Sequence, residues 1–329
     1  MLGAEVAGYA LDPCTVRDNF VLAGLSSKMT ADIRADIRDF KKLNSVIEDY
    51  KPEIIFHLAA QPLVRLSYEI PMETLETNIM GTANVLESFR MSESAKSLII
   101  ITSDKCYENK EWACGYRETD PMGGYDPYSA SKGAAELISS AYMRSFFNPK
   151  DFKKHGKTAA TVRAGNVIGG GDRAKDRLIP DCIRALEDGK LIEVRNPDAV
   201  RPWQHVLEPL GGYLLLAAKI NENPAKYSGA WNFGPYQDSV ITVKEVVEKV
   251  IKYYGKGVWK DISGGSAEVH EAKLLSLDIN KAVSVLGWKP KLNADEAIKL
   301  TVDYYKKCKE ANANAYEICR EQIKIFAGN

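Results

Sequence analysis

The sequence contains no surplus of charge, no long apolar run and no paired cysteines. Lys and Arg total 44 and Asp and Glu total 44 among 329 residues, so the formal net charge is zero. This balance lacks the excess of positive charge with which proteins bind nucleic acid non-specifically. No segment approaches the roughly 18 apolar residues that span a bilayer. The six cysteines form no CxxC pair and no cluster with metal-ligand spacing.

These absences favour an ordinary globular protein. The first residues show no basic segment followed by an apolar one, which is the pattern of a signal peptide. We therefore expect a cytoplasmic protein with reduced thiols that binds no nucleic acid, no membrane and no metal. At roughly 150 residues per domain, 329 residues predict about two domains.

Apolar runs alternate with helical patterns through the first half of the chain. The runs at 5–11, 53–59, 97–102 and 159–163 predict strands, and the segments 39–49, 72–91 and 127–144 predict helices. The runs are continuous rather than alternating, as buried strands of a parallel sheet are. The order β-α-β predicts an α/β fold with a doubly wound, mostly parallel sheet.

The pattern loosens after about residue 170, where we divide the chain into regions 1–170 and 171–329. Helices are expected in the second region at 178–188, 208–219, 242–253 and 294–309, between loops rich in Gly, Pro and Asn. Ligands of doubly wound sheets bind beyond the carboxyl ends of the strands. The residues that follow each apolar run are therefore the candidates for function.

Three reactive side chains follow the run at 97–102. Ser103, Asp104 and Lys105 place a hydroxyl, a carboxylate and an amine at one strand end. The alternative interpretation is a helix N-cap, since Ser and Asp both cap well.

A second candidate lies near the start of the helix expected at 127–144. Tyr128 and Lys132 are four residues apart and so share one helix face. A nearby ammonium group stabilises a phenolate, so we expect Lys132 to lower the pKa of Tyr128 and make it a usable base. Together with Ser103, this set suits the removal of a hydride from an alcohol.

With these residues the sequence resembles the extended short-chain dehydrogenases/reductases, and among them the CDP-glucose 4,6-dehydratases. The resemblance covers nearly the whole chain and rests on HLAAQPLVR at 57–65, SDKCYEN at 103–109, GGYDPYS at 123–129, RAGNVIGGGD at 163–172 and RPWQHVLEPL at 201–210. It implies that region 1–170 is a Rossmann-like NAD-binding domain. Region 171–329 would then be a smaller α/β region that mainly binds a nucleotide-sugar.

The resemblance implies an internal redox elimination on CDP-glucose with NAD as the cofactor, which classes the protein as a lyase. Tyr128, helped by Ser103, would remove the proton of the C4 hydroxyl, and Lys132 would hold the phenolate and the nicotinamide ribose. Lys105 would remove the C5 proton, and Asp104 would protonate the departing C6 hydroxyl. Related dehydratases often have Glu at the position of Lys105. A lysine is normally protonated near neutral pH, so it can act as a base there only if its pKa is lowered.

Two other classes of function stay open. One is another nucleotide-sugar enzyme of the superfamily, either a 4-epimerase or a dehydratase for a different base. The other is a non-catalytic protein that binds a sugar nucleotide. The epimerases lack the acid and base expected at Asp104 and Lys105, which favours elimination.

The expected cofactor contacts come from several strand ends. Asp36 and Ile37 would meet the adenine, although an Asp at a helix N-terminus is an equally good interpretation. Asp12 would bind the adenosine ribose, and since no basic residue adjoins it in sequence, we expect NAD rather than NADP. The full set is Asp12, Asp36, Ile37, Leu58, Ala59, Ala60, Gln61, Thr77, Tyr128, Lys132 and Val167.

The expected substrate contacts are Asn166, Arg177, Leu178 and Arg201. Arg177 and Arg201 would bind the diphosphate, since a guanidinium group matches two phosphate oxygens. A solvated surface arginine is the alternative for each. We interpret His57 and His205 as structural residues.

The sequence contains no G-x-G-x-x-G pyrophosphate fingerprint, and Gly169–Gly171 lies too late in the chain to serve as one. By the resemblance, the chain opens near the end of the family's first helix. We therefore expect the first strand and the glycine-rich loop to lie outside this sequence. On that expectation the chain alone would bind no NAD, and its central sheet would be left open.

The helices expected at 72–91 and 127–144 carry more apolar residues than one sheet face can cover. These include Leu75, Ile79, Leu137 and Tyr142. The resemblance implies that these helices pair between two copies, so the full-length protein is expected to be a homodimer.

Overall fold

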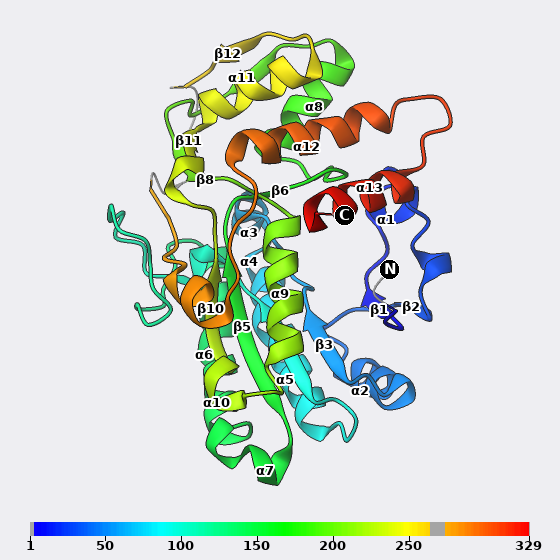
Figure 1. Ribbon diagram of the computed structural model, residues 1–329, viewed down its shortest axis with the longest axis vertical. Coiled ribbons are helices and arrows are strands. Elements are labelled where there is room, and N and C mark those ends of the chain that lie inside the picture. The colour runs from blue at the N-terminus through cyan, green and yellow to red at the C-terminus, as the bar shows by residue number, and fades with distance from the viewer. Residues whose placement is uncertain (1–2, 264–273, 329) are drawn as a thin grey trace.

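A four-stranded parallel sheet lies at the centre of the computed structural model, which describes residues 3–263 and 274–328 (Figure 1). Its order is β10-β5-β4-β3, formed by Gly229–Phe233, Thr158–Ala164, Ser97–Ile101 and Ile54–His57. All three pairings are parallel. The α/β fold expected from the sequence is confirmed.

A separate two-stranded sheet pairs β1 (Ala7–Ala10) with β2 (Ala31–Arg34), also in parallel. Within the described residues β1 pairs only with β2, and β3 pairs only with β4. The strands expected at 5–11 and 53–59 therefore belong to two different sheets.

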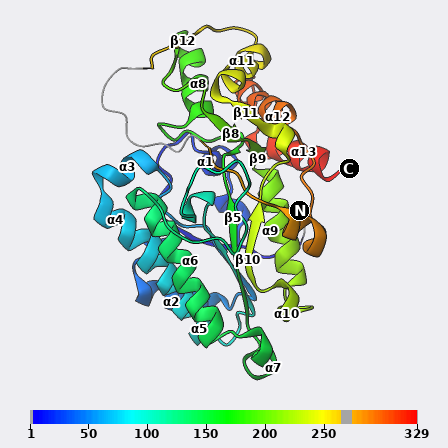
Figure 2. The same cartoon turned by 90° about the vertical axis from the view of Figure 1, so that its left-hand side faces the viewer.

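Helices cover both faces of the central sheet (Figure 2). On one face lie α4 (Pro71–Leu75), α5 (Gly81–Met91) and α6 (Pro127–Ser145), and on the other lies α9 (Leu207–Lys219). Successive residues of β4 serve the two faces, because Leu98 and Ile100 join the core under α5, whereas Ile99 joins the core under α9. This double burial explains why the run is continuously apolar.

The helix expected at 72–91 contains a wider turn. Glu76–Met80 form a π-helical turn, η2, between α4 and α5. The turn places Asn78 in the interior, where its amide accepts from the backbone N–H of Gln61 and donates to the Gln61 carbonyl and the Ser131 hydroxyl. Nothing in the apolar spacing predicted this cross-link.

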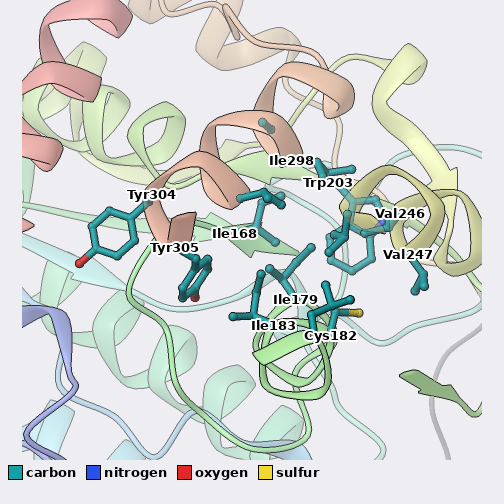
Figure 3. Close-up of a cluster of buried hydrophobic side chains, with 14 of the residues drawn as sticks. Ile168, Ile179, Cys182, Ile183, Trp203, Val246, Val247, Ile298, Tyr304 and Tyr305 are labelled. Atoms are coloured by element: carbon teal, nitrogen blue, oxygen red, sulfur yellow. The ribbon is translucent and has the colours of Figure 1, made fainter. Parts of the chain in front are cut away.

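The second half of the chain builds a core of its own around α8 (Leu178–Asp188), α11 (Val243–Tyr254) and α12 (Ala294–Lys307). Figure 3 shows Ile179, Cys182 and Ile183 facing Trp203, Val246 and Ile298 in this cluster. Three small sheets flank it. They pair β7 (Ile192–Val194) with β12 (Trp259–Asp261), β8 (Val200–Pro202) with β11 (Val240–Thr242), and β6 (Val167–Ile168) with β9 (Gln204–His205).

The predicted helices agree closely with the structure, and α2 (Phe40–Tyr50) completes the set expected for the first half. The sequence did not predict β2, β10, or the helices α1 (Asn19–Leu22), α3 (Val64–Glu69), α7 (Phe152–His155), α10 (Pro224–Tyr227) and α13 (Ala315–Ala327). Because β10 pairs with β5, part of the second region joins the central sheet. The division near residue 170 stays a prediction.

Short helical turns complete the structure, namely η1 (Ser26–Lys28), η3 (Asp104–Cys106), η4 (Pro149–Asp151), η5 (Gln237–Ser239) and η6 (Ala282–Leu286). Among the helices that the structure describes, none is both long and apolar enough to span a bilayer.

Candidate active site

A cavity of about 710 Å³ opens at the carboxyl ends of β4 and β5. Residues from the two candidate segments and from the second half of the chain line it together. They are Ser103, Asp104, Lys105, Tyr128, Asn166, Val167, Arg177, Leu178 and Arg201, with others between them. The structure therefore gathers every candidate substrate residue, and four of the five catalytic candidates, around one space.

Ser103 connects the two catalytic segments. Its hydroxyl donates to Asp104 Oδ1 over 3.0 Å and accepts from the Lys105 backbone N–H over 3.2 Å. The second contact makes Ser103 the N-cap of η3. Ser103 also lines the same cavity as Tyr128 and acts to lower the pKa of its phenol. The sequence offered helix capping and a place in the site as alternatives for this segment. Ser103 has both roles, since it caps η3 and lines the cavity.

Asp104 is buried at the bottom of the cavity, with only 4% of its surface exposed. Burial raises the pKa of its carboxyl group, and the charges of Lys105 and Arg201 offset part of that effect. A carboxyl group with a raised pKa holds its proton more readily, which suits a general acid.

Tyr128 differs from expectation in its pKa. Burial raises the pKa of the phenol to about 12, against the lowering effect of the Ser103 hydrogen bond. The expectation that Lys132 lowers this pKa was wrong for the protein without ligands. The Lys132 ammonium instead donates to the Ile101 carbonyl over 3.3 Å, and burial lowers the pKa of Lys132 to about 8.

Lys105 is half-buried in the cavity wall beside Asp104. Its position lets the amine reach a sugar in the same space as the Asp104 carboxyl group. Its role as the base stays a prediction.

The candidate cofactor residues after β3 lie close to α4 and α6. The Gln61 amide donates to the Thr74 hydroxyl and the Leu63 carbonyl, while Ala59 and Ala60 are half-buried and Leu58 is exposed. Thr77 is half-buried within η2. Val167 lines the large cavity. These positions leave the cofactor assignments as predictions.

The expected adenine and ribose contacts lie near β1 and β2. Asp36 is not the N-cap of α2, because that position belongs to Asp39. The Asp36 carboxylate instead pairs with Arg38 over 2.6 Å, which lowers its pKa. Asp12 is exposed, and the guanidinium of Arg34 donates to the carbonyl of the preceding residue, Leu11, so a basic group that the sequence did not reveal lies nearby.

The candidate substrate residues surround the far end of the cavity. Asn166 adopts a left-handed backbone conformation with φ of 49°, directly after β5. Arg177 pairs with Asp172 over 3.0 Å and remains partly exposed, and Leu178 begins α8. The Arg201 guanidinium donates to the Val200 carbonyl and also lines the cavity.

His57 and His205 are both buried, in agreement with their interpretation as structural residues. The ring of His57 shares a hydrogen bond of 3.0 Å with the Thr82 hydroxyl, and burial lowers its pKa to about 3. His205 is 1% exposed, and burial lowers its pKa to about 4.

Sequence reasoning missed a buried ion pair beneath the site, formed by Glu136 and Arg163. The available signal was spacing, since Glu136 continues the four-residue interval from Tyr128 through Lys132. That spacing alone gives a third residue in the series no evident role in the chemistry.

Comparison with known proteins identifies the group to which this architecture belongs. The family model described as GDP-mannose 4,6 dehydratase matches residues 24–301. The chain belongs to this family. It is 51% identical over 306 residues to the CDP-glucose 4,6-dehydratase of Salmonella typhimurium, covering 93% of this chain and 84% of that protein. It is 25% identical to the dTDP-glucose 4,6-dehydratase of Shigella flexneri, covering 82% of this chain and 77% of that protein.

Solved structures share the fold. The dTDP-glucose 4,6-dehydratase of Bacillus anthracis, in complex with NAD, aligns with a TM-score of 0.75 at 21% identity over 95% of this chain and 90% of that one. The UDP-glucose 4-epimerase of Thermotoga maritima, with UDP-glucose, aligns with a TM-score of 0.74 at 23% identity over 94% of this chain and 93% of that one.

Proposed function

We propose that this protein is a CDP-glucose 4,6-dehydratase that uses NAD and forms CDP-4-dehydro-6-deoxyglucose and water. The observation that carries the chemistry is the gathering of Tyr128, Ser103, Asp104 and Lys105 around one cavity, with Ser103 donating to Asp104. The choice of CDP-glucose rests on the 51% identity to the Salmonella enzyme of that name.

The residues present fit the nicotinamide half of NAD. Lys132 supplies a buried ammonium beside β4, and Ala59 and Ala60 allow close approach of a ligand to the chain after β3. Asp36 and Asp12 lie where the adenosine half would reach the carboxyl ends of β1 and β2. When bound, NAD would accept a hydride from C4 of the sugar and return it to C6.

The first half-reaction needs a base at the C4 hydroxyl. Tyr128 Oη is that base, and Ser103 Oγ orients the hydroxyl. Since the phenol has a pKa of about 12 without ligands, the positive charge of the nicotinamide ring of bound NAD would have to lower it. Tyr128 takes the proton as C4 becomes a ketone.

The elimination needs a second base and an acid. The C4 ketone acidifies the C5 hydrogen, and the Lys105 amine removes it as a proton. Asp104 gives its proton to the C6 hydroxyl, so the C–O bond breaks and water departs. The Lys105 ammonium then returns a proton to C5 as C6 becomes a methyl group.

The proton count closes within the protein. One turnover leaves an extra proton on Tyr128 and removes one from Asp104. Ser103 donates to Asp104 and lines the same cavity as Tyr128, so its hydroxyl would pass the proton from the phenol to the carboxylate. The net reaction then releases only water.

The phosphates of the substrate would meet Arg177 and Arg201 at the far end of the cavity. Both guanidinium groups lie beside β-strand or helix termini that line this space, with Asn166 between them and the catalytic groups in the chain order. Leu178 would contact the nucleoside.

We further propose that the protein forms a homodimer through α5 and α6. Leu137 on α6, Met80 on η2 and Met91 on α5 are exposed, whereas Leu75, Ile79 and Tyr142 are half-buried. A cytoplasmic location, expected from the sequence, stays a prediction.

Product analysis tests the proposed function. Protein that carries the glycine-rich loop implied by the resemblance, supplied with NAD and CDP-glucose, is expected to yield a product lighter than its substrate by one water, with no net consumption of NAD. A 4-epimer of unchanged mass would contradict elimination. Equal turnover of UDP-glucose or dTDP-glucose would contradict the choice of CDP-glucose.

A further inference from the structure

A buried ion pair lies beneath the catalytic groups and has no part in the reaction steps above. The side chains of Glu136 and Arg163 are each 4% exposed, and Arg163 contacts both carboxylate oxygens, with Nε and NH2 each 2.8 Å away. Arg163 also donates to the Tyr107 hydroxyl and the Glu118 carbonyl. The Arg163 guanidinium is thus held by Glu136 on one side and by Tyr107 and Glu118 on the other.

The Glu136 carboxylate joins three elements of the fold. It extends from α6, accepts from the Thr102 hydroxyl over 2.5 Å, and accepts from the Thr161 hydroxyl over 2.8 Å on β5. With the two bonds from Arg163, four donors share its two oxygens. We call Glu136, Thr102, Thr161 and Arg163 the Glu136 network.

The network connects the two segments that carry the catalytic side chains. Tyr128, Lys132 and Glu136 recur every four residues and share one face of α6. Thr102 directly precedes Ser103, the first residue of the other segment. The bond between Thr102 and Glu136 therefore links the end of β4 to α6 next to the reacting groups.

Stability alone does not account for such a pair. Burying two charges costs nearly as much as their attraction returns, and apolar side chains of similar size usually serve the fold as well. A carboxylate with four donors has all its hydrogen bonds in one arrangement only, so it fixes the relative orientation of the groups around it, which apolar packing does less strictly. The network therefore holds α6, β5 and the end of β4 in one relative orientation.

We propose that Glu136, held by Arg163, is a positioning residue that fixes Ser103 and Asp104 relative to Tyr128 and Lys132. It acts through Thr102 on one segment and through α6 on the other. The part of this inference that concerns turnover rests on the proposed function.

The same carboxylate influences the charge of Lys132. Burial lowers the pKa of Lys132, and Glu136 on its own helix and Cys106 on η3 act in the opposite direction. His57, from β3, also faces the ammonium group. Removing the Glu136 charge is therefore expected to lower the pKa of Lys132 further below about 8.

The two threonines provide a matched pair of variants. Thr102→Val and Thr161→Val each remove one buried hydroxyl bond to Glu136 without changing shape or charge, but only Thr102 adjoins a catalytic residue. We expect Thr102→Val to lower kcat at least tenfold with KM for CDP-glucose within twofold of wild type. Thr161→Val is expected to keep kcat within twofold at a similar loss of stability in urea.

Either of two results would overturn the positioning role. One is a wild-type kcat for Thr102→Val, and the other is an equal fall in kcat for both variants. If the wild-type protein itself forms no product lighter by one water from CDP-glucose, the proposed function fails instead, and the following measurement decides the inference alone.

That measurement uses the protein without cofactor or substrate. NMR titration of ¹⁵N-lysine-labelled protein, with Lys132 assigned by its absence in Lys132→Met, gives the pKa of Lys132 directly. In the variant Glu136→Gln, which keeps the Arg163 charge, we expect this pKa to fall by at least half a pH unit. An unchanged pKa would contradict the inference.

The control is a second ion pair that is mostly buried. Arg173 and Glu187 lie 3.1 Å apart, with side chains 13% and 11% exposed, and neither residue lines the large cavity. The variant Glu187→Gln is expected to leave the Lys132 pKa within 0.2 pH units of wild type. An equal shift in both variants would show a general effect of lost charge and would overturn the proposal.

Discussion

The Asp104 carboxyl group packs directly on the backbone of Gly165, just beyond the end of β5. A β-carbon at residue 165 would lie only 1.9 Å from Asp104 Oδ2, far inside van der Waals contact. Because Gly165 has no side chain, the carboxyl group of Asp104, the proposed acid, has room at this position.

Gly165→Ala is expected to displace the Asp104 carboxyl group and to lower kcat on the order of 10- to 100-fold, because misplacing a catalytic group by about 1 Å has effects of this size. Steady-state kinetics with CDP-glucose checks the effect. Gly211→Ala on α9 is the matched control, since its nearest new contact, the Phe326 ring, lies at an ordinary 3.5 Å. Unchanged kcat in Gly165→Ala would show that Asp104 is not the acid.

Two variants should separate the half-reactions. Tyr128→Phe removes the base at C4, so no reduced nicotinamide should form when substrate is added. Lys105→Ala removes only the base at C5, so oxidation at C4 should remain partly intact while elimination stops. Absorbance of reduced nicotinamide and deuterium uptake at C5 measure the two steps. Wild-type deuterium uptake by Lys105→Ala would contradict its assignment.

Stability should fall in acid because His57 stays neutral in the folded protein. Its pKa is about 3 when folded, against 6.5 for the free side chain, so below pH 6.5 the unfolded chain binds a proton that the folded one does not. From this residue alone we expect a loss of about 2 kcal/mol between pH 7.5 and pH 5.

Urea unfolding at the two pH values, compared between wild type and His57→Gln, checks this loss. The glutamine amide can still reach the Thr82 hydroxyl but does not titrate, so the variant should lose less stability in acid. A His57 ring that titrates near pH 6.5 by NMR in the folded protein would contradict the prediction.

The exposed side chain of Leu137 provides a test of assembly. Light scattering at micromolar concentration should give the mass of a dimer, and Leu137→Glu should shift it to a monomer because a carboxylate would be buried between apolar helices. A monomeric wild type would reject the proposed homodimer.

The sequence predicted the elements that carry strong local patterns. Helix α6 begins with the N-cap Asp126 before Pro127, and helix α8 ends at Gly189 in a left-handed conformation. The bounds of both helices agree closely with the expectation. The strands β4 and β5 were found because they are buried on both faces and so are apolar throughout.

Other features depend on contacts between distant segments, and local patterns could not reveal them. The run 229–233 became a strand because β5 offers it a parallel edge, although its own sequence is short and ends near Gly and Pro. The raised pKa of Tyr128 follows from burial in the assembled cavity, whereas the spacing to Lys132 pointed the other way. Glu136 had no visible role until Thr102 and Arg163 were placed beside it.

The π-helical turn at Glu76–Met80 has a consequence for chain length. Each residue of a helix advances the rotation by about 100°, and a π-turn holds one residue more than the α-helix needs. Deleting a single residue there would restore a regular helix but rotate Thr74 and Asn78 relative to Leu86 and Phe89 on the sheet side. All four side chains are buried, so the deletion would move one pair out of its packed position. Between Pro71 and Met91 a single substitution should therefore be tolerated better than the loss of one residue.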